Sequence, residues 1–409
     1  MTPTLRQGWR QTTVRRVLRP LDRPAQPELG VITAYRDGVV TLRSNRREDG
    51  YTFSDTENGY QEIRPGDLVF HALDGFAGAV GVSDSRGNAS PVYHVCEPVA
   101  GDDPAFIARL LRHLGTAGFL TTQAPSVRER SVDFRNWSTF ARIPLFLPSA
   151  AEQRSIANYL DRETSRIDTL IDEQQRLIEM LRERRQAVVD ESLHPDADWE
   201  VHALKFALDG IDQGVSPQAE SDLAQEPGSW GVLKSGCVNR GVFNPLEHKR
   251  LPDDFAVDER LAVSLGDLLV SRASGSPDLV GSAGTVDRLG YNLILSDKLF
   301  RLRLRDGHEP RFFYWLLNSR HYRTQVRQSI SGAEGLANNL PLSALRNFSI
   351  AVPPAADQRR IAAYLNDEIA KLDALIAETV RFIELSRERR AALITAAVTG
   401  QVDVQIGEA

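Results

Sequence analysis

Apolar residues recur at heptad spacing in two long stretches of the chain, residues 148–193 and 353–398. Neither stretch contains Gly or Pro after its opening residues, so each is expected to form one uninterrupted helix. The apolar stripe consists of Ile156, Leu160, Ile167, Leu170, Leu177, Leu181 and Val188 in the first helix, widened by Ile171 and Ile178, and of Ile361, Leu365, Leu372, Leu375, Phe382 and Leu393 in the second, widened by Ile369, Ile376 and Ile383. The opposite faces are charged, so each stripe requires a partner, and the other helix is the nearest one.

The two helical stretches are copies of one segment. Adding 205 to a residue number in the first copy gives its counterpart in the second without a gap, and 22 of the 46 aligned positions are identical. The first copy opens with Ser149 and Glu152, which fit a capping box, and the second has Asp357 in place of the glutamate. An internal repeat of this length indicates that the architecture itself is duplicated.

Each helix follows a segment with the pattern of a globular domain. In the first segment, short β-type runs at residues 30–35, 39–43 and 67–71 alternate with turns. Residues 36–38 are expected to form a hairpin turn, and a helix is expected at 104–114. The second segment repeats the first faintly: residues 66–68 recur as 266–268. Between such anchors the residues differ almost completely. Similar helices and divergent surfaces favour two readers that hold similar partners and recognise different targets, such as two half-sites of duplex DNA.

The expected fold is α/β (α+β), with two domains of small mixed sheets joined by two long antiparallel coiled-coil helices in a pseudo-twofold arrangement. The expected segments are residues 1–147 (first domain), 148–193 (first helix), 194–199 (linker), 200–352 (second domain), 353–398 (second helix) and 399–409 (tail).

Composition limits the class of protein. The 409 residues carry a net charge of −6, but residues 1–142 contain 18 Arg, no Lys and 16 acidic residues, so the first domain is slightly basic. Cys96 and Cys237 are the only cysteines and lie far apart, which favours a reducing compartment. With neither a secretory signal nor an apolar run of membrane-spanning length, the sequence predicts a cytoplasmic protein.

Motifs for chemistry are missing. The sequence has no GxxxxGK[ST] loop for ATP phosphates, and its one Pro-Pro pair, at residues 353–354, is followed by alanines rather than by the aromatic residue of an amino-methyltransferase loop. The eight histidines show no metal-ligand spacing. We therefore expect a non-catalytic chain that binds no metal and no cofactor of its own.

The two helices open alike at residues 148–156 and 353–361, and both contain RERR, at 182–185 and 387–390. With these motifs, and with weaker support from residues 230–234 and 266–272, the layout resembles the specificity subunit of type I restriction–modification enzymes. This resemblance implies two target-recognition domains, two methyltransferase subunits as partners, and through them the endonuclease subunits. S-adenosylmethionine, ATP and Mg²⁺ would then be bound by the partners, and the complex would serve phage defence.

Candidate DNA-binding residues have basic, amide or hydroxyl side chains, because Arg can bind guanine O6 and N7, Asn can bind adenine, and Ser lets the backbone approach phosphate. These candidates are Arg43, Arg46, Arg47, His71, Arg128 and Arg130 in the first domain, and Lys234, Asn239, Arg240, Ser271, Arg272, Ser274, Lys298, Asn338 and Asn339 in the second. Such side chains also occur on ordinary solvated loops, so each residue by itself is a weak signal.

Candidate docking residues are identities shared by the two helices, where one kind of partner would be contacted twice. They are Gln153, Tyr159 and Arg185 in the first helix and Gln358, Tyr364 and Arg390 in the second. Three alternatives remain open from the residues: a simple dimerisation coiled coil, a scaffold that does not bind DNA, and a specificity module of a methyltransferase-only or other phage-defence complex.

Overall fold

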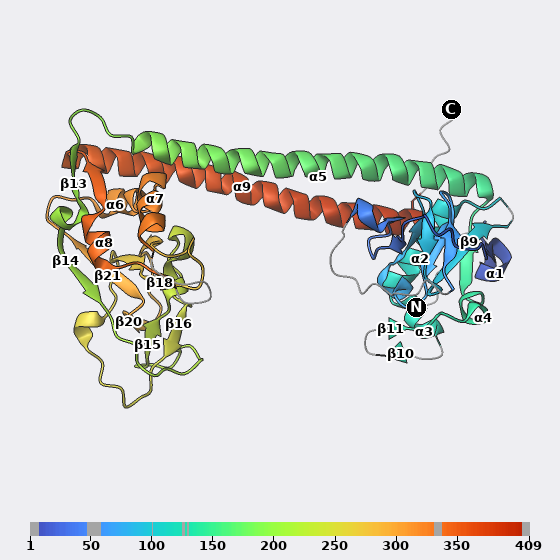
Figure 1. The fold of residues 1–409 in the computed structure, drawn as a ribbon, viewed down its shortest axis with the longest axis horizontal. Helices are drawn as coiled ribbons and strands as arrows, with labels where there is room; N and C mark the ends of the chain where they lie inside the picture. The colour runs from blue at the N-terminus through green and yellow to red at the C-terminus, as the bar shows by residue number, and fades with distance from the viewer. Residues whose placement is uncertain are drawn as a thin grey trace. The chain divides into compact units, whose positions relative to one another are not determined.

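A computed structural model describes residues 8–46, 59–99, 101–124, 127–128, 131–330 and 338–402 (Figure 1). The chain divides into two compact units. Unit 1 comprises Met1–Gln175 with Val380–Ala409, and unit 2 comprises Arg176–Thr379. Each unit therefore contains one globular domain, one half of the first long helix, α5 (Ala150–Ser192), and one half of the second, α9 (Ala355–Val398).

Unit 1 is built on an antiparallel four-stranded sheet with the strand order β2-β9-β6-β7. Its strands are β2 (Leu18–Pro20), β9 (Tyr93–Pro98), β6 (Leu68–His71) and β7 (Val80–Val82). The expected helix is α2 (Pro104–Thr116), where Asp103 caps the N-terminus by accepting a hydrogen bond from the Phe106 amide. Its apolar face packs into the core with Phe70 and Leu68 of the sheet.

Smaller elements complete unit 1. The predicted hairpin is present as β3 (Ile32–Ala34) and β4 (Val40–Leu42), with Gly38 at a φ of 93° in the turn. Further pairs are β5 (Gln61–Ile63) with β8 (Gly87–Ala89), β1 (Arg10–Thr13) with β12 (Pro144–Leu147), and β10 (Val127–Arg128) with β11 (Ser131–Val132). The short helices are α1 (Val14–Val17), α3 (Phe119–Gln123), α4 (Trp137–Phe140) and the 3₁₀ turns η1 (Arg43–Asn45) and η2 (Gly75–Ala77).

Unit 2 repeats the sheet of unit 1 strand for strand. Its order β14-β21-β17-β19 is formed by β14 (Leu208–Gln213), β21 (Leu299–Leu304), β17 (Leu268–Ser271) and β19 (Ala283–Thr285). The pair β13 (Glu200–Ala203) with β23 (Ser349–Val352) matches β1 with β12, and α6 (Pro310–Leu316) matches α2. Even the edge-to-face contact of Trp9 with Phe106 recurs as Trp199 with Phe312. The faint sequence echoes therefore mark a complete duplication of the domain core.

The remaining sheets of unit 2 differ from those of unit 1. A mixed three-stranded sheet has the order β16-β15-β20, with β15 (Trp230–Leu233) antiparallel to β16 (His248–Arg250) and parallel to β20 (Asn292–Ile294). A short pair joins β18 (Ala273–Ser274) to β22 (Asn338–Asn339). The other helices are α7 (Arg320–Ser329), α8 (Leu342–Asn347), η3 (Leu204–Ala207), η4 (Ser235–Gly241) and η5 (Glu259–Leu261).

Within each unit the two helix halves run in opposite directions. In unit 1, Arg390 pairs with Asp168 at 2.8 Å, while Val398 of α9 shares a core with Ile156 of α5. In unit 2, Arg185 pairs with Asp373 at 2.9 Å, and the last turns of α5 share a core with the first turns of α9. The two ion pairs are related by the 205-residue offset of the repeat. The antiparallel pairing predicted from the sequence is present in both units.

The predicted stripe residues Ile156, Leu160, Ile361, Leu365 and Leu372 are buried, but elsewhere the buried stripe lies to one side of the predicted one. Ile171, Ile178, Ile369 and Ile383 are buried, although the sequence placed them at the margin. The exposed positions among the predicted stripe are Leu170, Leu375 and Phe382. Adjacent apolar residues occur at 170–171, 177–178, 375–376 and 382–383, and one sequence cannot show which residue of each pair faces inward.

Candidate nucleic-acid and partner-binding surfaces

Each four-stranded sheet is buried on both faces. In unit 1, Leu68 and Phe70 of β6 face α2 and the long helices, whereas Val69 faces a second core formed by β3, β4, β5 and β8. In unit 2, Leu268 and Val270 of β17 face the helices, and Leu269 faces the other side. The alternation follows from the period of two residues in a strand. We call the elements on this second face the outer layer of each unit.

The outer layers differ although the sheets match. Unit 1 has two antiparallel strand pairs there, β3–β4 and β5–β8, whereas unit 2 has the mixed sheet β16-β15-β20 and the irregular turn η4. A chain with one duplicated scaffold and two different outer layers can present two different surfaces in equivalent places. This is the physical requirement for reading two unlike half-sites.

Several second-domain candidates lie close together despite their separation in sequence. Strand β18 pairs Ser274 with Asn338, and Ala273 with Asn339. Arg272 donates from its backbone N–H to the carbonyl of Lys298 and from Nη1 to the carbonyl of Asp297 at 3.0 Å. The structure thus gathers one Arg, one Lys, one Ser and two Asn around β18, which is a set of donors suited to phosphates and base edges.

The other second-domain candidates divide into exposed and buried ones. Arg240 is exposed in η4 and has a φ of 56°, a left-handed conformation that is uncommon for a residue with a side chain. Lys234 pairs with Glu247 at 3.7 Å, and Asn239 is half-buried beside Arg240. Ser271 is fully buried in β17, so its hydroxyl does not reach the surface in this fold, and we remove it from the proposed contacts.

First-domain candidates are less clustered. Arg46 is paired with Asp37 and lies over the Tyr35 ring at 4.7 Å, and Arg43 begins η1 with its Nε 3.4 Å from the Thr33 hydroxyl. His71 accepts hydrogen bonds at Nδ1 from two turn amides, and burial lowers the pKa of its imidazole, so it supports the turn as a neutral side chain. Arg47 and Arg130 lie outside the described residues, and Arg128 is described only through its backbone in β10.

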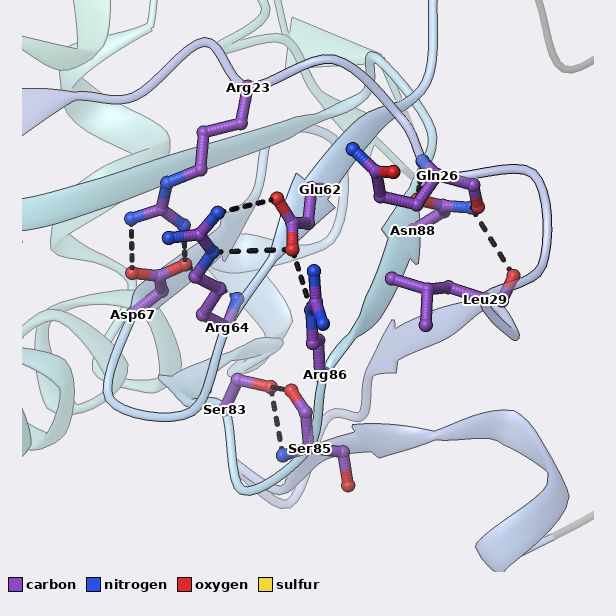
Figure 2. A network of polar contacts seen from close by, with 10 residues as sticks. All are labelled: Arg23, Gln26, Leu29, Glu62, Arg64, Asp67, Ser83, Ser85, Arg86 and Asn88. Atoms are coloured by element: carbon purple, nitrogen blue, oxygen red, sulfur yellow. Dashed lines mark hydrogen bonds and ion pairs between the residues drawn. The ribbon is translucent and has the colours of Figure 1, made fainter.

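The outer layer of unit 1 contains two arginines that sequence reasoning missed. Arg64 and Arg86 both bind Glu62 of β5, and Figure 2 shows their guanidinium groups approaching its carboxylate from two directions. No sequence pattern links these three residues, because Arg86 is 24 positions from Glu62 and reaches it only through the pairing of β5 with β8.

Two of the docking candidates are structural. Gln153 is fully buried, and its amide accepts from the Asp103 N–H at 2.9 Å and donates to Asp102 and to the Pro148 carbonyl. Gln358 occupies the same place in unit 2, accepting from the Glu309 N–H and donating to the Pro353 carbonyl. Both glutamines join a domain to its long helix, which explains their identity in the two copies, and neither is available to a partner in this fold.

The other docking candidates are partly engaged. Tyr159 packs against the core of unit 1, whereas its counterpart Tyr364 is exposed. Arg185 and Arg390 form the two equivalent ion pairs described above. These arginines therefore fix the register of the helix halves within each unit, as charged residues beside a coiled-coil seam do.

Two equivalent apolar patches remain on the outside of the helices. Leu177 and Met180 lie on one face of α5 in unit 2, with exposed Arg184 one turn further on. The offset of 205 maps them onto Phe382, Leu385 and Arg389 of α9 in unit 1. Met180 is 58% exposed and Leu385 is 53% exposed. We call these two sets the helix patches, and they suit a partner that contacts the chain twice.

Comparison with known proteins identifies the fold and the family resemblance. No protein-family model matches the chain. Among curated proteins, the EcoEI specificity subunit of Escherichia coli is 29% identical over 178 residues, covering 43% of this chain. The EcoKI specificity subunit of E. coli K12 is 22% identical over 282 residues, or 66% of this chain, and the StySPI specificity subunit of Salmonella potsdam is 24% identical over 169 residues. The resemblance to type I restriction specificity subunits is confirmed.

Solved structures agree with this assignment of the fold. A chain from a type I restriction–modification system matches with a TM-score of 0.73 and 17% identity over 98% of this chain and all of the other. The HsdS subunit of Thermoanaerobacter tengcongensis matches with a TM-score of 0.58 and 19% identity over 97% of this chain and 98% of the other.

The alignments to the curated specificity subunits span only 30%, 60% and 36% of the lengths of EcoEI, EcoKI and StySPI.

The described ranges contain neither a group of residues suited to a metal ion nor a helix suited to a membrane. Within the described ranges, no group of three or more His, Cys, Asp or Glu side chains is arranged to hold a metal ion. Among the helices of the same ranges, none combines the length and the apolar character needed to cross a membrane.

Proposed function

We propose that this chain is the DNA sequence-specificity subunit of a type I restriction–modification enzyme, in which each domain reads one half of a bipartite, asymmetric target. The observation that carries the proposal is the contrast within the chain: identical sheet order and helix attachment in both units, but unrelated outer layers. Selection for two different DNA half-sites would retain the shared sheets and helix attachments and diversify the outer layers. The similarity to curated specificity subunits supports the same function.

The partners would supply the chemistry. In the proposed complex, two methyltransferase subunits bind the helices, and endonuclease subunits join through them. S-adenosylmethionine, ATP and Mg²⁺ would be bound by these partners and not by this chain. The two equivalent helix patches support a partner present in two copies, and they replace Gln153 and Gln358 as the proposed docking positions.

Methylome sequencing of cells with and without the gene tests the function. The expected result is one bipartite methylated motif, with two unlike halves and a non-specific spacer, that disappears when the gene is deleted. An unchanged methylome would favour a scaffold that does not recognise DNA. A lost motif without any restriction of unmodified phage would favour a specificity module of a methyltransferase-only complex.

Lengthening the helices tests their proposed role in setting the spacer. One heptad inserted between Gln175 and Arg176, and one between Thr379 and Val380, adds ~10 Å to each helix and leaves the contacts inside both units intact. The methylated motif is expected to keep both halves and to gain ~3 base pairs of spacer, at ~3.4 Å per base pair. A heptad in α5 alone is the control, because it shifts the helix pairing and should abolish methylation. An unchanged spacer in the double insertion would contradict the role.

Replacing Arg272 by Ala tests the cluster around β18. If Arg272 forms a bidentate contact to a base, the variant should lose ~1–3 kcal/mol of binding to DNA that carries the second half-site. Binding that depends on the first half-site should not change. Fluorescence anisotropy with duplexes altered in one half at a time gives the measurement, and equal weakening on every duplex would assign Arg272 to phosphate.

A further inference from the structure

Glu62 in the outer layer of unit 1 is a buried carboxylate that binds two surface arginines. Its side chain is 2% exposed, whereas those of Arg64 and Arg86 are 55% and 56% exposed. Arg64 donates from Nε and Nη2 at 3.2 and 3.0 Å, and Arg86 donates from Nε at 2.7 Å (Figure 2). The three residues form a fixed cluster with a surplus of one positive charge at the surface.

The carboxylate stays ionised at any physiological pH. Hydrogen bonds from Arg64 and then Arg86 lower the pKa of Glu62 to about 2. A lowered pKa in the folded state contributes stability that is complete above the unfolded value, ~4.3, and is lost as the pH falls toward 2. Between pH 5 and 8 the cluster therefore keeps its charge and its geometry.

The two arginines differ in the donors that remain free. Arg64 donates to Glu62 from both Nε and Nη2, so only its Nη1 group remains to bind another acceptor. Arg86 donates to Glu62 from Nε alone, so the edge formed by its two Nη groups has no partner among the described residues. A free two-nitrogen edge matches guanine O6 and N7, whereas a single free donor suits a phosphate oxygen.

Unit 2 provides an internal comparison that separates folding from binding. The turn at Gly66 recurs at Gly266, and in both units an Arg holds the aspartate that follows: Arg23 binds Asp67, and Arg301 binds Asp267 at 3.2 Å. The Arg64 N–H donates to Asp67 at 2.7 Å, as the Ser264 N–H donates to Asp267 at 2.9 Å.

The same comparison shows that the cluster is not required by the turn. The positions of Glu62 and Arg64 are Ala262 and Ser264 in unit 2, at the 200-residue offset, and the turn forms equally there. The buried carboxylate and the Arg64 side chain are therefore an addition specific to unit 1. Burying a carboxylate costs free energy unless it is well paired, and the turn forms without it, so we look for the reason in binding rather than in folding.

We propose that Arg86 reads a guanine of the first half-site, that Arg64 binds an adjacent phosphate, and that Glu62 positions both. The inference rests on the proposed function and adds residues to it. Glu62 acts as a positioning residue: it orients the two guanidinium groups before DNA arrives, which reduces the conformational entropy lost on binding.

The test uses the assembled complex with its methyltransferase subunits and the motif found by methylome sequencing. Arg86→Ala is expected to lower binding to cognate DNA about 5- to 150-fold, the equivalent of ~1–3 kcal/mol, and to remove the preference for one G·C pair in the first half-site. Arg64→Ala should weaken binding to all duplexes alike and reduce the slope of log affinity against log salt by ~1.

Two further variants separate positioning from simple structural support. Arg86→Lys keeps the charge but not the planar fork, so it should lose the base preference and keep the salt slope. Glu62→Gln should show a smaller loss at the same base pair. Arg19→Ala, an exposed arginine paired with Glu97 in the same unit, is the matched control and should leave affinity and preference unchanged.

The outcomes are distinguishable. If the parent complex has no sequence preference, the proposed function fails. If the parent is selective and folded Arg86→Ala and Arg86→Lys complexes keep full preference at every base pair, this inference is overturned, and a lowered melting temperature alone would assign the cluster to stability. Should Arg86→Ala fail to fold, Arg86→Lys by itself decides the question.

Discussion

Replacing Phe382 and Leu385 by Asp is expected to remove one methyltransferase subunit from the proposed complex. Both side chains are exposed on α9, and a carboxylate placed in an apolar contact must be desolvated without a partner. Hot-spot residues at the centre of an interface contribute ~2 kcal/mol or more each, so two substitutions at such positions should prevent binding at micromolar concentrations. Mass photometry of the co-purified complex measures the number of subunits bound.

The duplicated chain supplies the controls for this experiment. The equivalent pair Leu177→Asp with Met180→Asp should remove the other subunit, and the four substitutions together should leave the chain without either. Glu179→Lys with Glu384→Lys changes exposed charges about 100° around each helix from Met180 and Leu385, and should leave both subunits bound. Two bound subunits in the fourfold variant would exclude the helix patches as the docking surface.

Replacing Gln153 by Leu is expected to destabilise unit 1 by ~3–5 kcal/mol, because the change leaves a buried carboxylate and an amide N–H with too few partners. The glutamine side chain binds the Asp103 N–H at 2.9 Å and the carboxylate of Asp102 at 2.7 Å. The Asp102 side chain is 1% exposed, and among the described residues it pairs with Arg10. Urea denaturation followed by circular dichroism measures the change.

Matched variants give the scale of this effect. Gln358→Leu removes the same amide from unit 2, but its neighbour at the position of Asp102 is His308 and no carboxylate is stranded, so ~1–3 kcal/mol is expected. Gln186→Leu removes only a hydrogen bond to Asp190 on the surface of α5 and should cost less than ~0.5 kcal/mol. An equal cost at Gln153 and Gln186 would contradict the structural role of Gln153.

Much of the architecture could be predicted from one sequence because the chain contains two copies of each part, which can be compared with each other. The helices, the hairpin at Gly38 and the helix beginning at Pro104 follow from periodicity and turn chemistry, and the structure confirms them. The repeated anchors at residues 66–68 and 266–268 correctly indicated a second copy of the domain, since each lies in the same turn before the same strand.

The candidate sites were predicted less well, for reasons that the residues make plain. Identity between the two helices pointed to Gln153 as a docking residue. Identical residues are retained for folding as well as for binding, and only the burial of the side chain shows which of these roles it has. Basic runs pointed to Arg43 and Arg46, whereas Arg64 and Arg86 are isolated in sequence and come together through strand pairing and one buried acid.

The sequence by itself determined that the chain is a duplication of one domain with one helix, because hydrophobic period and internal identity are properties of residue order. The tertiary structure alone decided which apolar face of the helices is buried and which remains as a patch, since neighbouring apolar residues in a heptad fit either face equally well. It also decided which polar groups are supports and which are exposed donors. That distinction depends on desolvation, and desolvation is set by contacts between residues far apart in the chain.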